Sequence, residues 1–394
     1  MAKKKSKKRV RAVEILTVCA AAGCNEKLIV EPMEESTPLC EKCFERICLL
    51  CQTIGLHWFS AHSIPSFISW SSHPEILPPS TSKLVSSRTS PAQPAVSIEV
   101  AASLLRQAQC VCIVAGAGAS ADSGVPVFRG PSGFYRVNGI DIPMDAINFH
   151  QDRQGDLALA WGYLLKMMQS FDEKEPHDGY KALLKMVSTK DSFFVFTSNI
   201  DNYFVRAGFP SEQIWESHGN VETLQCVNYS TSKGVRSSCS STIFPVKTDN
   251  DPKGGEWYRC AKFGADMKVV NLEATIPKCP SCGSLSRPNI SHCTDLPEDI
   301  CLEKKGLQEK RFRSWVEENK GKRLLVIEVG CGISEHSLRD ESELICERLW
   351  ENSFAKIVRI DPGNCDVAKG HIGIQLKAME ALLKFSAAYF PQEE

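Results

Sequence analysis

Closely spaced cysteines are the residues of this chain with the most recognisable chemistry. The 394-residue sequence contains 18 cysteines. Three C-x-x-C pairs stand among them, at Cys40 and Cys43, Cys48 and Cys51, and Cys279 and Cys282. Such a pair holds two thiolates at the separation that a tetrahedral zinc ion requires. Because we expect no secretory signal, a reducing compartment and zinc explain these pairs better than disulfides do.

A glycine-rich loop is the second feature with a chemical meaning. Residues 110–115 form a short apolar run, and the loop Gly116-Ala117-Gly118-Ala119-Ser120-Ala121 follows it directly. A strand followed by G-x-G-x-x-A allows a tight turn in which the backbone approaches a pyrophosphate. The pattern therefore favours a dinucleotide site. The alternative is a glycine turn that only packs a helix onto a strand.

The continuation of this loop resembles the sirtuin family of NAD-dependent protein deacylases. An ordinary dehydrogenase would continue into a helix, whereas residues 122–130 read Asp-Ser-Gly-Val-Pro-Val-Phe-Arg-Gly. The residues that match the family pattern are Gly116, Ala117, Gly118, Ser120, Ser123, Gly124, Pro126, Phe128, Arg129 and Gly130. Val127 stands where the family usually has Asp. The resemblance implies that this loop covers the NAD pyrophosphate and nicotinamide ribose, with Phe128 and Arg129 at the nicotinamide end.

A second stretch resembles the catalytic motifs of the same family. Ser198-Asn199-Ile200-Asp201 follows an apolar run at 193–197, and His218-Gly219 comes shortly after it. The resemblance implies that Asn199, Asp201 and His218 are catalytic and that Asn199 and Asp201 also contact NAD. An imidazole suits proton transfer near neutral pH, and the family uses it as a general base on a ribose hydroxyl. Ser198 replaces the usual Gln of the family.

Two further loops resemble the sirtuin loops that contact the rest of the cofactor. The apolar run 324–329 ends in Gly330-Cys331-Gly332, where most sirtuins have G-T-S. The run 356–360 ends in Asp361, where the family usually has an Asn near the adenosine. The resemblance implies that Gly330, Cys331 and Asp361 bind NAD. These differences, with Arg339 downstream, predict a divergent branch of the family.

The cysteines divide into two predicted zinc sites. The resemblance implies a structural zinc held by Cys226, Cys239, Cys279 and Cys282, with Cys260 as the alternative to Cys239. A further alternative is that this zinc is lost and the cysteines carry no metal. The spacing of Cys19, Cys24, Cys40 and Cys43 is compatible with a separate four-cysteine zinc ribbon, and Cys48 and Cys51 would form a further half-site or compete as ligands. The alternative is a cysteine-rich helix, whose spacing part of this set also fits.

The elements that must position these motifs alternate between strands and helices. Apolar runs at 110–115, 193–197, 324–329 and 356–360 predict buried parallel strands, and 155–171, 177–187 and 307–318 predict helices. This alternation predicts an α/β fold, a Rossmann-like open parallel sheet with an inserted small zinc-binding module at about 222–288. The expected domains are a basic arm and zinc ribbon at 1–55, a Ser/Pro-rich linker at 56–96, and the catalytic domain at 97–394.

Charge and hydropathy exclude some classes of protein. The 46 Lys and Arg nearly balance the 47 Asp and Glu, which excludes a wholly cationic nucleic-acid-coating protein. The basic arm at 3–11 still allows a weak nucleic-acid contact or a nuclear import signal, so we expect a nuclear or cytoplasmic protein. Apolar runs are shorter than the ~20 residues of a membrane span, so we expect no membrane partner.

The resemblance to the sirtuin family implies an NAD-dependent protein-lysine deacetylase or deacylase that acts on an acylated protein, with NAD and Zn²⁺ as cofactors. A departure from the family pattern follows Arg287-Pro288-Asn289-Ile290, because the usual Phe-Gly pair is missing from 291–295. An alternative on the same fold is a mono-ADP-ribosyltransferase or NAD glycohydrolase, which needs no acyl tunnel. The third reading is a noncatalytic NAD-binding scaffold, which the presence of His218, Asn199 and Asp201 disfavours.

Overall fold

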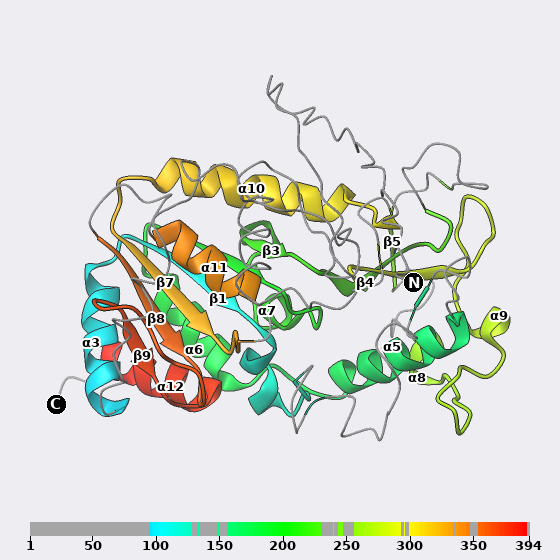
Figure 1. The fold of residues 1–394 in the computed structure, drawn as a ribbon, viewed down its shortest axis with the longest axis horizontal. Helices are drawn as coiled ribbons and strands as arrows, with labels where there is room; N and C mark the ends of the chain where they lie inside the picture. Colours follow the sequence, from blue (N-terminus) through cyan, green and yellow to red (C-terminus); the bar gives the residue numbers. More distant parts are fainter. Residues whose placement is uncertain are drawn as a thin grey trace, which may run out of the picture. The chain divides into compact units, whose positions relative to one another are not determined.

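The computed structural model describes residues 94–127, 133, 148–149, 156–229, 239, 243–246, 256–292, 295, 299–333, 336–346 and 354–391 (Figure 1). All of these residues belong to one compact unit of the chain, Lys83–Glu394, hereafter the second unit. The predicted basic arm and zinc ribbon lie outside the described residues. Phe128 and Arg129 also lie outside them.

A six-stranded parallel sheet forms the centre of the second unit, as the apolar runs predicted. Its strand order is β3-β2-β1-β7-β8-β9, and all five neighbouring pairs are parallel. The strands are β1 (Cys110–Ala115), β2 (Ser192–Thr197), β3 (Ile214–Glu216), β7 (Leu324–Val329), β8 (Ala355–Ile360) and β9 (Ile372–Ile374). The four predicted strands are present, and the short β3 and β9 extend the sheet at its two edges.

Helices cover both faces of this sheet because its central strands are apolar on both sides. Val111 and Ile113 pack into one core with α3 (Pro94–Gln107), α6 (Asp178–Val187) and α12 (Ala378–Tyr389). Cys112 and Val114 pack into a second core with α10 (Glu303–Asn319) and α11 (His336–Leu344). Figure 1 shows α10 and α11 on one side of the strands and α3, α6 and α12 on the other. This confirms the α/β, Rossmann-like fold.

The predicted helices lie close to their expected positions. The stretch 155–171 corresponds to α5 (Leu157–Asp172), whose first turn is capped by a hydrogen bond from Leu159 N to Asp156 Oδ1. The stretch 307–318 lies within α10, which begins earlier, at Glu303. The N-terminal helix α3 begins at Pro94, within the last three residues of the predicted linker. Proline is well suited to a first helical turn because that turn needs no N–H donor there.

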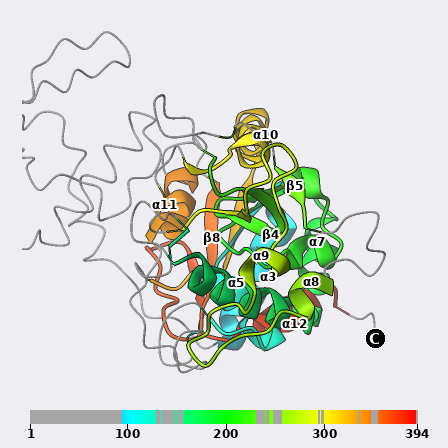
Figure 2. The same cartoon turned by 90° about the vertical axis from the view of Figure 1, so that its right-hand side faces the viewer.

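A small antiparallel sheet is inserted between β3 and α10. Its order is β5-β4-β6, with β4 at Gly219–Cys226, β5 at Phe244–Pro245 and β6 at Ser286–Ile290. Trp161 of α5 is fully buried and donates its indole N–H to the Ser286 carbonyl at 2.9 Å. The short helices α8 (Glu256–Arg259) and α9 (Leu272–Thr275) lie in the same insertion, visible beside α5 in Figure 2.

Among the described residues, none of the helices combines the length and the apolar character needed to cross a bilayer.

Candidate active site and cysteine cluster

The predicted site residues gather at one edge of the parallel sheet. The strands β1, β2, β3, β7 and β8 run in the same direction, so the loops that follow them share the carboxyl edge. The chain proceeds from β1 to β2 on one side and later returns to β7 on the other side of β1. Open α/β sheets bind their ligands at such a switch point.

Two glycine loops interlock at this switch point. A Cβ on Gly116 or Gly118 would lie 2.7 Å from backbone atoms of Gly330, and one on Gly330 would lie 2.3 Å from Ala119 N. Gly118 N donates to Gly330 O at 3.0 Å. Glycine is therefore required in both loops by their contact with each other. After the contact the chain forms two 3₁₀ turns, Ala117–Ala119 and Ala121–Ser123, rather than a long helix.

The buried Ser120 hydroxyl joins three segments of the site. Its Oγ donates to Asp201 Oδ2 at 2.5 Å and lies 2.9 Å from Tyr180 Oη of α6. Asn199 Nδ2 donates to the same Oγ at 3.3 Å and to Gly116 O at 3.0 Å. A hydroxyl has one donor and two acceptor positions, so Tyr180 must be a donor here. Burial raises the pKa of Asp201, an effect that the Ser120 hydrogen bond partly offsets.

The start of α6 is fixed against the same loop by His177. Its Nδ1 accepts from Gly179 N at 3.1 Å, so Nε2 carries the proton and donates to Ala119 O at 2.8 Å. His177 N also donates to Ser123 Oγ at 2.9 Å. Burial lowers the pKa of His177, which agrees with this neutral form. Ser123 thus contacts α6 and helps to hold the glycine loop in place.

Removing only the Tyr180 hydroxyl should separate its role at Ser120 from its role in packing. In Tyr180→Phe the ring keeps its edge contacts with Tyr203 and Phe204, at 6.3 and 5.0 Å between centroids. Ser120 loses one donor, so we expect kcat/KM of the reaction at this site to fall roughly tenfold with little change in the melting temperature. The control is Tyr389→Phe, because the Tyr389 hydroxyl forms its hydrogen bond with Thr189, far from the site. Wild-type kinetics in Tyr180→Phe would contradict the assignment.

His218 lies where the parallel sheet meets the small sheet. It follows β3 and is half-buried, and the Ser217 amide hydrogen-bonds to Thr197 O at the end of β2. Burial and the Lys305 ammonium lower the pKa of His218 to about 4, against the effect of a hydrogen bond to the Ser198 backbone. Gly219 has a left-handed backbone, and a Cβ there would lie 2.1 Å from Asn289 O. Only glycine can follow His218 at this crossing.

A buried polar network holds the segment that carries His218. The Glu216 carboxylate accepts from Asn220 Nδ2 at 2.7 Å and from Gln308 Nε2 at 3.0 Å, and it pairs with Lys304 at 3.2 Å. The Glu216 amide donates to Gln308 Oε1 at 3.1 Å. Residues on both sides of His218 are therefore tied to each other and to α10. Such a network fixes the position of the segment that carries His218.

The loops after β7 and β8 carry the remaining predicted NAD residues. Cys331 turns its thiol into the apolar core, 3.5 Å from Val114 O, so its backbone is the part that can face a ligand. The Asp361 carboxylate accepts from the Gly363 and Asn364 amides at 2.9 and 2.7 Å, and its other oxygen accepts from Gly332 N at 3.3 Å. Asp361 therefore connects the two loops.

A charged pair beneath these loops was not anticipated from the sequence. Glu328 and Arg359 are register partners on β7 and β8, and both are buried. Arg359 donates to both Glu328 carboxylate oxygens, at 2.5 and 2.9 Å, and to Glu343 of α11 at 3.2 Å. Glutamate and arginine inside otherwise apolar strands are the signal that could have indicated this pair.

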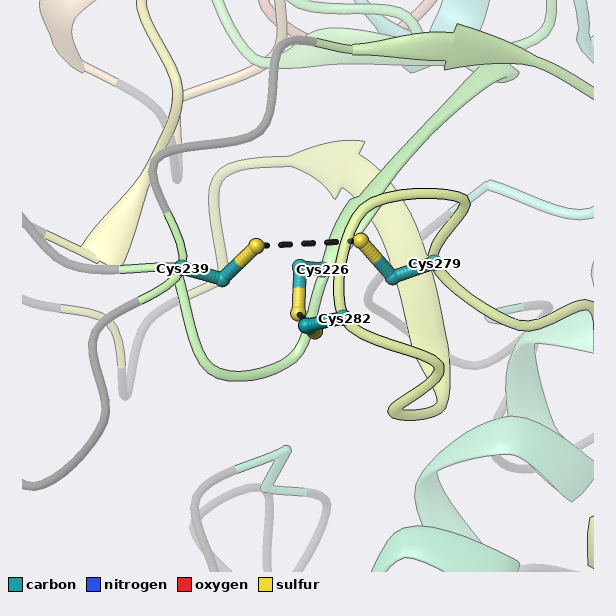
Figure 3. A group of neighbouring side chains, drawn as sticks. All are labelled: Cys226, Cys239, Cys279 and Cys282. Carbon is teal, nitrogen blue, oxygen red and sulfur yellow. Dashed lines mark hydrogen bonds between the residues drawn. The ribbon is translucent and has the colours of Figure 1, made fainter.

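Four cysteines converge in the small sheet and its loops (Figure 3). The sulfur atoms of Cys226, Cys239, Cys279 and Cys282 all lie within 4.8 Å of one another. The Sγ atoms of Cys226 and Cys282 are 3.5 Å apart, and those of Cys239 and Cys279 are 3.7 Å apart. A zinc ion with four sulfurs at ~2.3 Å places them about 3.8 Å apart. The donor set therefore fits zinc. Cys260 is exposed and is not part of this cluster.

Within the described part of the chain, the predicted site residues gather in two places. Gly116, Gly118, Ser120, Asn199 and Asp201 are joined by direct contacts at the carboxyl edge. The four cysteines form a separate cluster at the far end of β4. Tyr180 and Glu216 support the group at the carboxyl edge, but they were not predicted from the sequence. A tyrosine in an amphipathic helix and a glutamate at the end of a short strand have no distinctive spacing.

An open parallel sheet with polar loops at its switch point is typical of a dinucleotide-binding α/β protein. The Sir2 family profile matches residues 116–303. A curated relative, NAD-dependent protein deacylase 2 of Pseudomonas aeruginosa, is 33% identical over 185 residues, 46% of this chain and 67% of the relative. The chain belongs to the Sir2 family.

A second curated relative and a solved structure are also similar to this chain. The NAD-dependent protein deacylase of Thermococcus kodakarensis is 29% identical over 190 residues, 48% of this chain and 62% of the relative. The match thus spans about two thirds of the length of these two curated relatives. A solved structure of a Sir2 homologue in complex with NAD has a TM-score of 0.50 at 18% identity, covering 74% of this chain and 93% of that one. This structural likeness supports the fold.

Proposed function

We propose that this chain is an NAD-dependent protein deacylase that transfers an acyl group from a lysine side chain to ADP-ribose, with release of nicotinamide and consumption of water. The observation that carries the proposal is the joining of the glycine loop to Asn199 and Asp201 through Ser120, at the sheet edge where His218 also lies. The similar proteins from Pseudomonas aeruginosa and Thermococcus kodakarensis are both named NAD-dependent protein deacylases.

The loops at the carboxyl edge present accessible backbone that NAD could approach. Ala117 and Gly118 are half-buried at the end of β1, and nothing lies within 4 Å of a Cβ built on Gly332. Beyond their mutual contact at Gly330, both loops are therefore open to a ligand. Bound NAD would supply a glycosidic bond to nicotinamide, a good leaving group, and so make its ribose able to accept the acyl oxygen.

Each polar residue of the edge then has a distinct role. The Asn199 amide and the Asp201 carboxylate, held by Ser120, would orient the ribose and the acyl group. The neutral His218 imidazole would take a proton from a ribose hydroxyl as the acyl group transfers. Asp361 would hold the loops after β7 and β8 at the adenosine end. Gly330 would keep the backbone of that loop close to the glycine loop.

The four clustered cysteines would hold one structural zinc ion, which has no open position for substrate in a four-thiolate site. The cluster lies at the far end of β4 from His218, so the ion would stabilise the inserted module and take no part in acyl transfer. Its role would be to fix β4 and β6.

A second candidate function is mono-ADP-ribosyl transfer or NAD hydrolysis at the same edge. The segment after Ile290 favours it, because the family's Phe-Gly pair is replaced and Asp295 is engaged by Arg287 through two hydrogen bonds of 2.6 and 2.7 Å. A deacylase normally uses this segment to line its acyl-lysine tunnel.

Nicotinamide release in the presence of NAD separates these functions. The protein is incubated with NAD alone and with NAD plus an acyl-lysine peptide or the same peptide unacylated. Release that requires the acylated peptide, with equal loss of the acyl group, supports the deacylase. Release without any peptide supports the hydrolase, and labelled ADP-ribose on protein supports the transferase. NAD binding without nicotinamide release under any of the three conditions would favour the noncatalytic NAD-binding scaffold.

The lowered pKa of His218 gives a specific expectation for the acidic limb of the pH profile. A base works only when it is unprotonated, and with a pKa of about 4 the imidazole stays neutral at all higher pH values. We therefore expect kcat/KM to remain nearly constant from pH 8 down to pH 6 and to fall only as the pH approaches 4. The measurement uses NAD and one acyl peptide at constant ionic strength. A half-maximal point near pH 6.5 would show that Lys305 and burial do not act on His218 as described.

A further inference from the structure

A lysine of α10 contacts the segment that departs from the family pattern, at the residue that hydrogen-bonds to His218. Lys305 is in the first turn of α10, and its Nζ lies 3.0 Å from Ser291 Oγ. The Ser291 amide in turn donates to the His218 carbonyl at 2.9 Å. Two hydrogen bonds therefore connect the ammonium group to His218. Ser291 is also the first residue after β6, where the sequence leaves the sirtuin pattern.

The charge of Lys305 is not matched by a close acid. Within the part of the chain that the structure describes, none of the carboxylates forms an ion pair with Lys305, whereas the adjacent Lys304 pairs with Glu216 at 3.2 Å. The acids that act on Lys305 at longer range are Glu309 and Asp295. The second of these is already held by both terminal nitrogens of Arg287. Burial accordingly lowers the pKa of Lys305.

The partly buried position of the Lys305 ammonium is energetically unfavourable unless an anion binds beside it. A partly desolvated ammonium without an ion pair costs free energy, and a negative group brought beside it recovers part of that cost. The same ammonium is the charged group that lowers the pKa of His218. Because Ser291 contacts both the Lys305 ammonium and the backbone of His218, an anion that balances this ammonium would lie beside the reacting part of the substrate.

We propose that Lys305, with Ser291, forms an anion subsite beside His218 that binds a carboxylate at the end of the acyl group, so that lysines bearing a dicarboxylic acyl group are preferred to acetyl-lysine. This inference rests on the proposed deacylase function. The inference specifies the substrate class of the deacylase, and it is based on a residue that lies outside the recognised motifs. The hydroxyl of Ser291 can contribute a hydrogen bond to the same carboxylate.

The test compares two peptides of identical sequence, one with succinyl-lysine and one with acetyl-lysine. For the wild-type protein we expect a higher kcat/KM with the succinyl peptide. In Lys305→Gln we expect this preference to fall roughly ten- to a hundredfold, the range for losing a hydrogen bond to a charged group, while acetyl-lysine turnover changes less. Lys305→Arg should retain much of the preference. Lys310→Gln, which removes the same charge from an exposed position on α10, should leave it unchanged.

Two further measurements distinguish the ways in which the idea can fail. Calorimetry of both peptides with the wild type and Lys305→Gln tests the subsite without turnover, and it decides the matter if neither peptide is deacylated. Equal binding of the two peptides by the wild type, or an unchanged preference in Lys305→Gln, would overturn the proposal. A third peptide carries acetyl-lysine next to aspartate. If this peptide alone depends on Lys305, the lysine reads a flanking side chain and the acyl assignment is wrong.

Discussion

Replacing His218 with alanine is expected to remove nearly all deacylation while NAD binding and thermal stability stay close to wild type. A positioned general base contributes typically ~10²–10⁴-fold in rate, so kcat should fall by about that factor. The affinity for NAD should change little, because the contacts proposed for the cofactor belong mainly to the loops after β1, β2, β7 and β8. The half-buried imidazole fills no large part of either apolar core, so the fold should persist.

The assay follows loss of the acyl group and release of nicotinamide together, with NAD titrated by calorimetry. His218→Tyr provides a second variant of larger volume. Wild-type turnover in either variant would make His218 a structural residue and remove the base from the proposed mechanism. If nicotinamide release without peptide survives in His218→Ala and deacylation is absent from the wild type, NAD hydrolysis becomes the better account.

Loss of one clustered thiolate is the other change with a large expected effect, here on stability. Cys279→Ser removes a buried sulfur from the four-cysteine cluster, and structural zinc contributes about 10–16 kcal/mol of apparent binding free energy in small zinc domains. We expect the zinc content of the full chain to fall by about one ion and the inserted module to lose protection from proteolysis. Elemental analysis and limited proteolysis measure these two quantities.

Cys260→Ser is the matched control, because Cys260 is exposed and lies outside the cluster. It should retain the wild-type zinc content and digestion pattern. Equal zinc in the wild type and Cys279→Ser would show that the cluster holds no metal. Equal loss of zinc in Cys260→Ser would indicate that this cysteine, and not Cys239, supplies the fourth thiolate.

The central strands could be predicted because their sequences are apolar over their whole length. Residues 110–115 and 324–329 coincide with β1 and β7, and β2 and β8 each begin one residue before the prediction. Burial on both faces makes such strands continuous apolar runs. The strands β3 and β9 have only three residues each, too few for a pattern to emerge. The six-stranded sheet is therefore a product of pairing at its edges as well as of local sequence.

The site was predictable to the extent that it consists of motifs close in sequence. Gly116, Asn199 and His218 stand in such motifs, and the structure places all three at the carboxyl edge. Tyr180 and Lys305 come from helices whose own patterns reflect only packing. Their importance depends on single distances to Ser120 and Ser291, which no spacing rule encodes. The glycine loop was predicted as a dinucleotide site, and its contact with the loop after β7, where Gly116 and Gly118 meet Gly330, was not predicted.

The small sheet gives the inserted module a mechanical connection to the active site. β4 runs from Gly219, next to His218, to Cys226, and its partner β6 runs from Ser286 to Ile290, next to Ser291. At about 3.3 Å per residue the longer strand spans roughly 25 Å. Both strands are thus anchored by cysteines at one end and carry site residues at the other. The two strands should exchange their amide hydrogens as one cooperative unit. Oxidation of the clustered thiols should therefore abolish activity at the carboxyl edge before the six-stranded sheet unfolds.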